Sequence, residues 1–325
     1  IAVSNVGGDY FVSEPSVTAR ISIERRFFPA GDWYDMNSRL IESHDGNILY
    51  TRGKYYWYGQ IMNTDSPEIE AVGVSVYSSN DLLNWTEEQP IVYGGRLHII
   101  ERPHVIYNAT TSKYVMWGHN VISYPNSRAF VAYGDNPTGP FTISSTTYNP
   151  NGEGLNDMNL FKDADGKAYV LYSNGINTKF FISLLTDDYL DTTETFLNPA
   201  NHNGREAPAM FIRNGIHYLV TSGLSGWAPN MNTYATSTTG VLGTWSTRVN
   251  PFVPSVEEDY TIAFRSQTTH ILEIPGRSGS YIYMGDRFSY ADVNNGSLYG
   301  TRHVWLPITM GTGTVMTIPW KSSWD

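Results

Sequence analysis

Cysteine is absent from the 325 residues of this chain, which excludes disulfide bridges, a cysteine-ligated zinc site and a cysteine nucleophile. Charged residues make up only 16% of the sequence, and no run of Lys and Arg forms the basic patch typical of nucleic-acid binding. No apolar stretch approaches the roughly 18 residues of a membrane-spanning helix. We therefore expect no nucleic-acid partner, no membrane partner and no cofactor.

Aromatic residues, in contrast, are abundant. The chain has 23 Tyr, 9 Trp and 13 Phe, together with 29 Gly and 17 Pro. Aromatic and β-branched residues favour strands, whereas Gly, Pro, Asn and Asp favour the turns between them. The composition therefore predicts an all-β protein with many short strands.

A repeated unit organises the sequence. Five segments share a polar residue, an apolar run, a turn and an aromatic-rich second run, at 45–59, 101–117, 157–172, 206–218 and 267–284. Their aromatic anchors are Tyr55, Tyr114, Tyr169, Tyr218 and Tyr281. Anchors spaced by roughly 50–60 residues match the period of a four-stranded propeller blade. Five such units predict a five-bladed β-propeller.

The domain organisation follows from the same pattern. Residues 1–35 are predicted to form a lead-in segment, and residues 36–325 a single propeller domain, because no linker-like change of composition divides them. Signals for outer strands fall between the units, at 79–85, 136–141, 186–190 and 242–245. We expect the final segment, 299–325, to close the ring with a strand.

The polar residues that open the five units are the candidate functional residues. They are Asp45, Glu101, Asp157, Glu206 and Gln267. A single acidic residue at a strand start is usually a turn or cap residue, but equivalent positions in five blades would meet at one end of the propeller axis. Carboxylates gathered there repel one another and push their pKa values apart, so that one can be held protonated near neutral pH.

That arrangement suits glycoside hydrolysis, which needs an acid for the leaving oxygen and a base for water. Trp227 lies in a Ser/Gly-rich segment and could stack on a sugar.

We predict no metal site. Asp163 and Asp165 imitate part of a calcium loop but indicate a hairpin turn. His270 is interpreted as a core residue, although an ion or water on the axis stays open, and His44 could orient its neighbour Asp45.

The chain is acidic, with a net charge of −10 and a pI of about 5.2. It also contains three glycosylation sequons, at Asn84, Asn108 and Asn295. These features together favour a secreted, extracellular protein.

Several motifs then carry a resemblance to a known family. The most specific are Glu101-Arg102-Pro103-His104, the segment 160–169, Arg205-Glu206-Ala207-Pro208, the segment 222–230, Ser266-Gln267, Met284-Gly285-Asp286-Arg287 and Val304-Trp305-Leu306-Pro307. From about Ile41 to Asp325 the chain resembles glycoside hydrolase family 43, and within it the exo-β-1,3-galactanase group.

The resemblance implies roles for the five axis residues. Glu206 matches the general acid, and Asp157 matches the aspartate that orients this acid and tunes its pKa. Asp45 falls where most of the family has its base. The galactanase group generally lacks that aspartate, and a glutamine matching Gln267 is proposed to activate water beside a glutamate matching Glu101. Both routes stay open at this point.

The resemblance thus implies an inverting, exo-acting hydrolase that releases galactose from β-1,3-galactan or arabinogalactan. We expect a monomer whose partner is a plant cell-wall type polysaccharide or oligosaccharide. Further sugar contacts are predicted from Trp227, Ser225, Tyr124, Asn177 and Arg287. The alternatives are another activity of the family (α-L-arabinofuranosidase, β-xylosidase or β-galactofuranosidase), a non-catalytic sugar-binding propeller, and a protein-interaction propeller.

Overall fold

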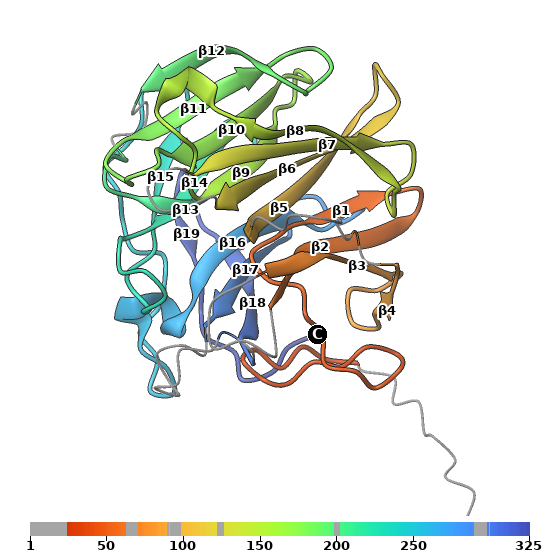
Figure 1. Cartoon of the computed structure of the whole chain (residues 1–325). Coiled ribbons are helices and arrows are strands. Elements are labelled where there is room, and N and C mark those ends of the chain that lie inside the picture. Colours follow the sequence, from red (N-terminus) through yellow and green to blue (C-terminus); the bar gives the residue numbers. More distant parts are fainter. Residues whose placement is uncertain are drawn as a thin grey trace, which may run out of the picture.

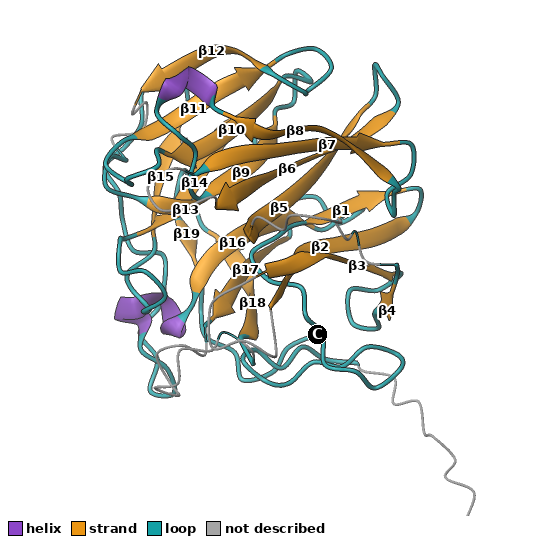
Figure 2. Cartoon of the chain, in the orientation of Figure 1, coloured by secondary structure: helices purple, strands orange, loops and turns teal. Residues whose placement is uncertain are grey.

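A computed structural model of the chain describes residues 25–62, 71–89, 91, 99–121, 127–197, 202–288, 298 and 300–325. Five antiparallel sheets surround a common axis, and Figure 1 shows their order around the ring following the sequence from orange through green to blue. Figure 2 shows how little of the chain is helical. The predicted all-β, five-bladed propeller is therefore confirmed. Among the described residues, no helix is long and apolar enough to cross a membrane.

Each blade is a meander in which strands adjacent in sequence are also adjacent in the sheet. The first blade contains β1 (Ile48–Thr51), β2 (Lys54–Met62), β3 (Ala71–Ser79) and β4 (Thr86–Glu87). The second contains β5 (Ile99–Asn108), β6 (Lys113–Val121), β7 (Arg128–Gly134) and β8 (Phe141–Tyr148). The third contains β9 (Met158–Lys162), β10 (Ala168–Ser173), β11 (Phe180–Leu185) and β12 (Thr192–Leu197).

The fourth blade contains β13 (Glu206–Arg213), β14 (Ile216–Ser222) and β15 (Thr233–Ser237). The fifth contains β16 (Gln267–Glu273), β17 (Tyr281–Arg287), β18 (Arg302–Met310) and β19 (Met316–Thr317). Two short 3₁₀ segments, η1 (Pro150–Gly152) and η2 (Tyr260–Arg265), lie in connections between blades.

The five aromatic anchors all lie at the start of the second strand of a blade. In four blades the anchor faces another ring across the first hairpin: the pairs are Tyr50–Tyr55, Tyr107–Tyr114, Phe161–Tyr169 and Phe211–Tyr218, with centroids 4.7–6.5 Å apart. Such cross-strand pairs stabilise the register of an antiparallel sheet. The hairpins at Gly53 and Gly215 are two-residue turns, and both glycines have the positive φ that these turns require, at 80° and 76°.

The hydrophobic core is divided into five main clusters, each between two adjacent blades. The cluster between the fifth and first blades contains Trp57 and Trp85 from the first blade and Trp305 from the fifth, all at most 1% exposed. Phe27, before the first blade, and Trp324, near the C-terminus, form a bridge beside it.

This seam corrects the expectation that residues 299–325 close the ring with a strand. In the described part of the chain, β18 and β19 belong to the fifth blade, and the first blade takes all its strands from its own segment. Side-chain packing closes the ring instead. The outer-strand signals at 79–85, 136–141 and 186–190 are followed by β4, β8 and β12. The signal at 242–245 is wrong, because the turn there is followed only by an isolated bridge between Val249 and Tyr234, just before Pro251.

Candidate active site

One cavity of about 220 Å³ lies where the inner strands of the five blades begin. The five predicted axis residues, one from each blade, all line it: Asp45, Glu101, Asp157, Glu206 and Gln267. Trp227 and Asn177 line it too, together with Arg102, Asn156 and Gly226. The repeat in the sequence therefore does converge on one pocket, as expected for equivalent positions of a propeller.

Bulges at the starts of the inner strands shape this pocket. The register of β5 shifts between Glu101 and His104, and that of β13 shifts between Glu206 and Ala209. Arg102 and Ala207, directly after the two glutamates, have positive φ values of 49° and 51°. A bulge inserts an extra residue and redirects side chains. In the second blade it lets two consecutive residues, Glu101 and Arg102, both line the cavity.

Arg102 is the central cation of the site, and it was missed as a functional residue in the sequence. Its Nε lies 3.0 Å from Asp157 Oδ2, and a terminal nitrogen lies 3.5 Å from Asp45 Oδ1. The same terminal nitrogen donates to Gln267 Oε1 at 2.6 Å. Although burial opposes the charge, Asp157 and Asp45 raise the pKa of Arg102 further above its usual value. The side chain thus neutralises part of a buried acidic cluster.

Glu206 has the properties of a general acid. Its carboxyl accepts hydrogen bonds from Gln267 Nε2 at 3.1 Å and from Asn177 Nδ2 at 3.2 Å. Burial, followed by the nearby charge of Asp157, raises the pKa of Glu206 to about 8, although Arg102 opposes the shift. The carboxyl is therefore protonated at neutral pH while still lining the cavity, so it can donate its proton to a bound molecule.

Asp157 holds the backbone beside this acid. Its Oδ2 accepts a hydrogen bond from the amide of Ala207 at 3.1 Å and also contacts Arg102. Because Ala207 follows Glu206, Asp157 fixes the strained peptide on which the acid is mounted. The aspartate thus acts on Glu206 through both geometry and charge.

Asp45 lies on the other side of Arg102 and is only 2% exposed. Gln60 donates to its Oδ2 at 3.0 Å, and its own amide donates to Asp286 Oδ2 at 2.6 Å. Burial raises the pKa of Asp45 to about 8; Arg102 opposes this shift, whereas Asp286 and Asp157 add to it. A carboxyl that is protonated at neutral pH cannot accept a proton from water.

Gln267 links the cation to the acid. Its carbonyl accepts from Arg102, and its amide nitrogen donates to Glu206 and to Ser222 Oγ, the latter at 3.0 Å. Nearby, Glu101 is 5% exposed and pairs with His119 Nδ1 at 3.1 Å. Gln267 and Glu101 thus supply a polarised amide and a carboxylate to the same cavity.

The predicted sugar-binding residues divide into two groups. Trp227 lines the cavity and packs at 74° against Phe288 with a centroid distance of 4.7 Å, so its ring is held in place. Asn177 also lines the cavity, but its amide contacts Glu206 and is itself held by Asn156 and Ser173, which makes it a positioning residue for the acid.

Ser225 and Arg287 do not line the main cavity. Ser225 donates its hydroxyl to the Ala228 carbonyl at 2.6 Å and stabilises its own loop. Arg287 pairs with Glu258 at 3.0 Å and donates to the Phe264 carbonyl, and it lines a small neighbouring cavity. Tyr124 falls outside the described residues. Asn156, by contrast, lines the main cavity and has no strong sequence signal, because asparagine before a strand is also common in turns.

Among the residues that the structure describes, two groups of side chains have the composition of metal ligands. One is Glu101, His119 and Asp157 at the cavity, and the other is His44, Asp286 and His303 behind Asp45. His270 is different, because burial, with a further effect of His104, lowers its pKa to about 3 and keeps the ring neutral.

Comparison with known proteins identifies the family of the chain. The family model for glycosyl hydrolases family 43 matches residues 41–307. A family 43 β-1,3-galactosidase structure has a TM-score of 0.81 and 34% identity, over 92% of this chain and 63% of its own. A second, solved with galactodeoxynojirimycin, has a TM-score of 0.81 and 30% identity, over 92% of this chain and 100% of its own. This chain therefore spans less than two thirds of the first structure and the whole of the second.

An exo-β-1,3-galactanase from Phanerochaete chrysosporium is also similar. A variant of it, solved with β-1,3-galactotriose, has a TM-score of 0.81 and 29% identity, over 93% of this chain and 68% of its own. No curated protein matches the chain in sequence. The family match extends from before the first blade into the last, and the chain belongs to glycosyl hydrolase family 43.

Proposed function

We propose that the chain is an exo-acting, inverting β-1,3-galactanase that releases galactose from the end of a β-1,3-galactan chain. The observation that carries the proposal is Glu206, a carboxyl whose pKa is raised to about 8 at the wall of the pocket where the five blades meet. The similarity to β-1,3-galactosidases at 30% and 34% identity supports the choice of sugar and linkage.

In the proposed reaction, Glu206 gives its proton to the glycosidic oxygen as the bond from that oxygen to the anomeric carbon breaks. A water molecule attacks the same carbon from the opposite face, so the product has the inverted configuration. Glu206 is left ionised, and the nearby Arg102 stabilises the new charge. Asp157 keeps the peptide after Glu206 in place throughout.

Gln267 is a better candidate than Asp45 for the residue that positions the attacking water. Arg102 polarises its carbonyl, and the side chain is held by hydrogen bonds at both ends. We assign Gln267 the positioning of the water and Glu101 the role of the carboxylate that takes up its proton. Asp45 fits this role poorly because its raised pKa leaves it protonated at neutral pH.

The size of the pocket supports exo action. Its volume of about 220 Å³ lies below the roughly 300–1,000 Å³ typical of pockets for drug-sized ligands. The inner strands of all five blades surround it, which suits the end of a chain rather than its middle. Trp227 at its wall offers an apolar face for a sugar ring.

The proposed substrate in nature is a plant cell-wall type galactan or arabinogalactan, and we propose a secreted monomer. The support for secretion is narrower than the sequence suggested. Asn108 is only 1% exposed and donates to the Asp187 carbonyl at 2.7 Å, so this sequon is closed to a glycan. Asn84 is partly exposed, and Asn295 lies outside the described residues.

A product assay tests the proposal directly. The chain is incubated with β-1,3-galactan and with aryl glycosides of α-L-arabinofuranose, β-xylose and β-galactofuranose, and released monosaccharides are measured. We expect galactose from the galactan and little from the other substrates. Sugar release from one of the aryl glycosides without release from the galactan would assign another activity of the family, and binding without any release would indicate a sugar-binding propeller.

A further inference from the structure

We propose that His44, Asp286 and His303 form a binding site for a zinc-class divalent metal ion that clamps the first blade to the fifth. The proposal rests on the geometry of these three side chains and not on the proposed function, although Asp286 also accepts a hydrogen bond from the amide of Asp45 at the catalytic pocket. His44 precedes β1, Asp286 belongs to β17 and His303 belongs to β18. The three side chains are therefore brought together only where the ring closes.

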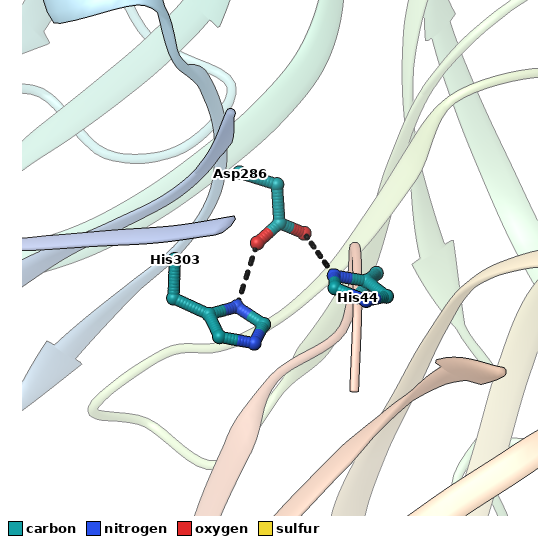
Figure 3. Close-up of side chains that lie close together, drawn as sticks. All are labelled: His44, Asp286 and His303. Atoms are coloured by element: carbon teal, nitrogen blue, oxygen red, sulfur yellow. Dashed lines mark hydrogen bonds and ion pairs between the residues drawn. The ribbon is translucent and has the colours of Figure 1, made fainter. Parts of the chain in front are cut away.

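The ligand atoms are close and buried. One ligand atom of each residue lies within 4.8 Å of the others, and the three residues are 0–3% exposed. Figure 3 shows the two imidazole rings facing the two oxygens of the Asp286 carboxylate. His303 Nδ1 lies 3.0 Å from Asp286 Oδ1, whereas His44 Nδ1 lies 3.9 Å from Oδ2, beyond hydrogen-bonding distance. A small shift would let both nitrogens and one oxygen contact a shared ion.

The neighbours of the cluster match those of a protein metal site. Metal-binding histidines usually give their other ring nitrogen to a carboxylate, and ligating carboxylates usually accept a further hydrogen bond. His44 Nε2 lies 3.1 Å from Glu42 Oε2, which leaves Nδ1 facing Asp286 without a hydrogen bond. The Asp45 amide donates to Asp286 Oδ2 at 2.6 Å. His44 and Asp286 therefore each have an outer partner, whereas Nε2 of His303 has no hydrogen bond.

The surroundings favour a compact ion of borderline softness. Two imidazoles and one carboxylate are a ligand set that zinc adopts, with a fourth position free for water. Trp57 packs edge-on against His303 at 4.6 Å, and Trp33 lies at 5.4 Å, so the cluster has an apolar wall. Such a wall lowers the local dielectric constant and strengthens the attraction between ion and ligands.

The position gives the ion a structural role. Among the described residues the ring closes by packing rather than by a shared strand, and the sequence contains no cysteine that could supply a disulfide. A link between residues far apart in sequence removes most freedom from the unfolded chain. His44 and Asp286 come from opposite ends of the propeller, so an ion between them would stabilise its closure.

The test uses the full chain, stripped with a chelator and then titrated with zinc sulfate. We expect one zinc per chain and a rise of the thermal midpoint on zinc addition. Glu42→Gln should weaken binding about 10–100-fold, and His303→Gln at least as much, because the first removes an outer partner and the second removes a ligand. The matched control is His217→Gln, since His217 pairs with Asp163 at 3.0 Å between two other blades.

The control should bind zinc like the natural chain. Equal zinc binding by His303→Gln and the natural chain, or an unchanged midpoint of the natural chain with zinc, would overturn the proposal. If His303→Gln does not fold, anomalous diffraction at the zinc edge on the natural chain decides instead. A peak among His44, Asp286 and His303 supports the site, whereas a peak only at Glu101, His119 and Asp157, or none, refutes it.

Discussion

Glu206 and Asp45 lie near the same arginine, Arg102, and both have a pKa raised to about 8, yet only Glu206 suits a catalytic role. Glu206 lines the cavity among amide donors from Asn177 and Gln267. Asp45 is tied to Gln60 and, through its backbone, to Asp286 at the seam. The same protonation that makes a carboxyl useful as an acid makes it useless as a base. The burial that qualifies Glu206 for its role therefore disqualifies Asp45 from the complementary one.

The largest effect should come from the acid itself. Glu206→Gln keeps the size and shape of the side chain but cannot donate the proton, and it keeps only one of the two oxygens that accept from Gln267 and Asn177. We therefore expect kcat on β-1,3-galactan to fall by about 10³–10⁴. KM should change little, because binding contacts remain. Steady-state galactose release measures both constants, and an unchanged kcat would remove Glu206 from the mechanism.

The next effect distinguishes Gln267 from Asp45 as the residue that acts on the attacking water. Gln267→Ala removes the amide that bridges Arg102 and Glu206, and we expect kcat to fall about 10²–10³-fold. Asp45→Asn replaces a protonated carboxyl by a group of equal size, and we expect a loss of at most about fivefold. Kinetics of the two variants under identical conditions make the comparison. A silent Gln267→Ala beside an inactive Asp45→Asn would reverse the assignment.

The pH profile sharpens the same contrast without mutation. Glu206 must be protonated, so kcat/KM should fall as pH rises through about 8. If Asp45 were the base, activity would also fall below about 8, because its carboxyl gains a proton there. We expect a profile that stays level from pH 6 to the alkaline limb. A narrow bell centred near pH 8 would instead identify Asp45 as the base.

A smaller effect is expected at Asn177, which acts through the acid. Asn177→Ala removes one hydrogen-bond donor to the Glu206 carboxyl. Such donors favour the ionised carboxylate, so their loss raises the pKa of Glu206. We expect the alkaline limb to move to higher pH and kcat to fall by about tenfold. Ser225→Ala, in the neighbouring loop, is the control and should leave the limb where it is. An unmoved limb in Asn177→Ala would assign this residue a purely structural role.

The last effect concerns stability rather than catalysis. The pKa of Glu206 rises from 4.5 to about 8 on folding, so its contribution to stability is complete below pH 4.5 and is lost as pH rises through 8. Glutamine does not titrate. Glu206→Gln should therefore gain in thermal midpoint relative to the natural chain between pH 5 and pH 9, and a difference independent of pH would contradict the assigned burial.

Much of this architecture could be predicted from the sequence because it repeats. The five anchors and the polar residue before each of them have local signals, and repetition turns five weak signals into one strong one. Arg102 had no such signal. Its role depends on a bulge that brings two consecutive residues to the cavity, and on carboxylates contributed by other blades.

The protonation of Asp45 could not be predicted from the sequence for a related reason. Its position before an inner strand matches the usual base, but its protonation is set by burial and by Asp286, which is more than two hundred residues away in sequence. Arg287 and Ser225 were assigned from motifs, whereas their side chains are used by nearby loops. Ring closure was likewise a property of packing between distant segments.

The most direct test of the central claim is to follow the hydrolysis of β-1,3-galactotriose by proton NMR, with the natural chain and with Glu206→Gln. We expect the natural chain to release galactose one unit at a time, first as the α-anomer, and the variant to release almost none. Initial release of the β-anomer, or galactose production at an equal rate by Glu206→Gln, would contradict it.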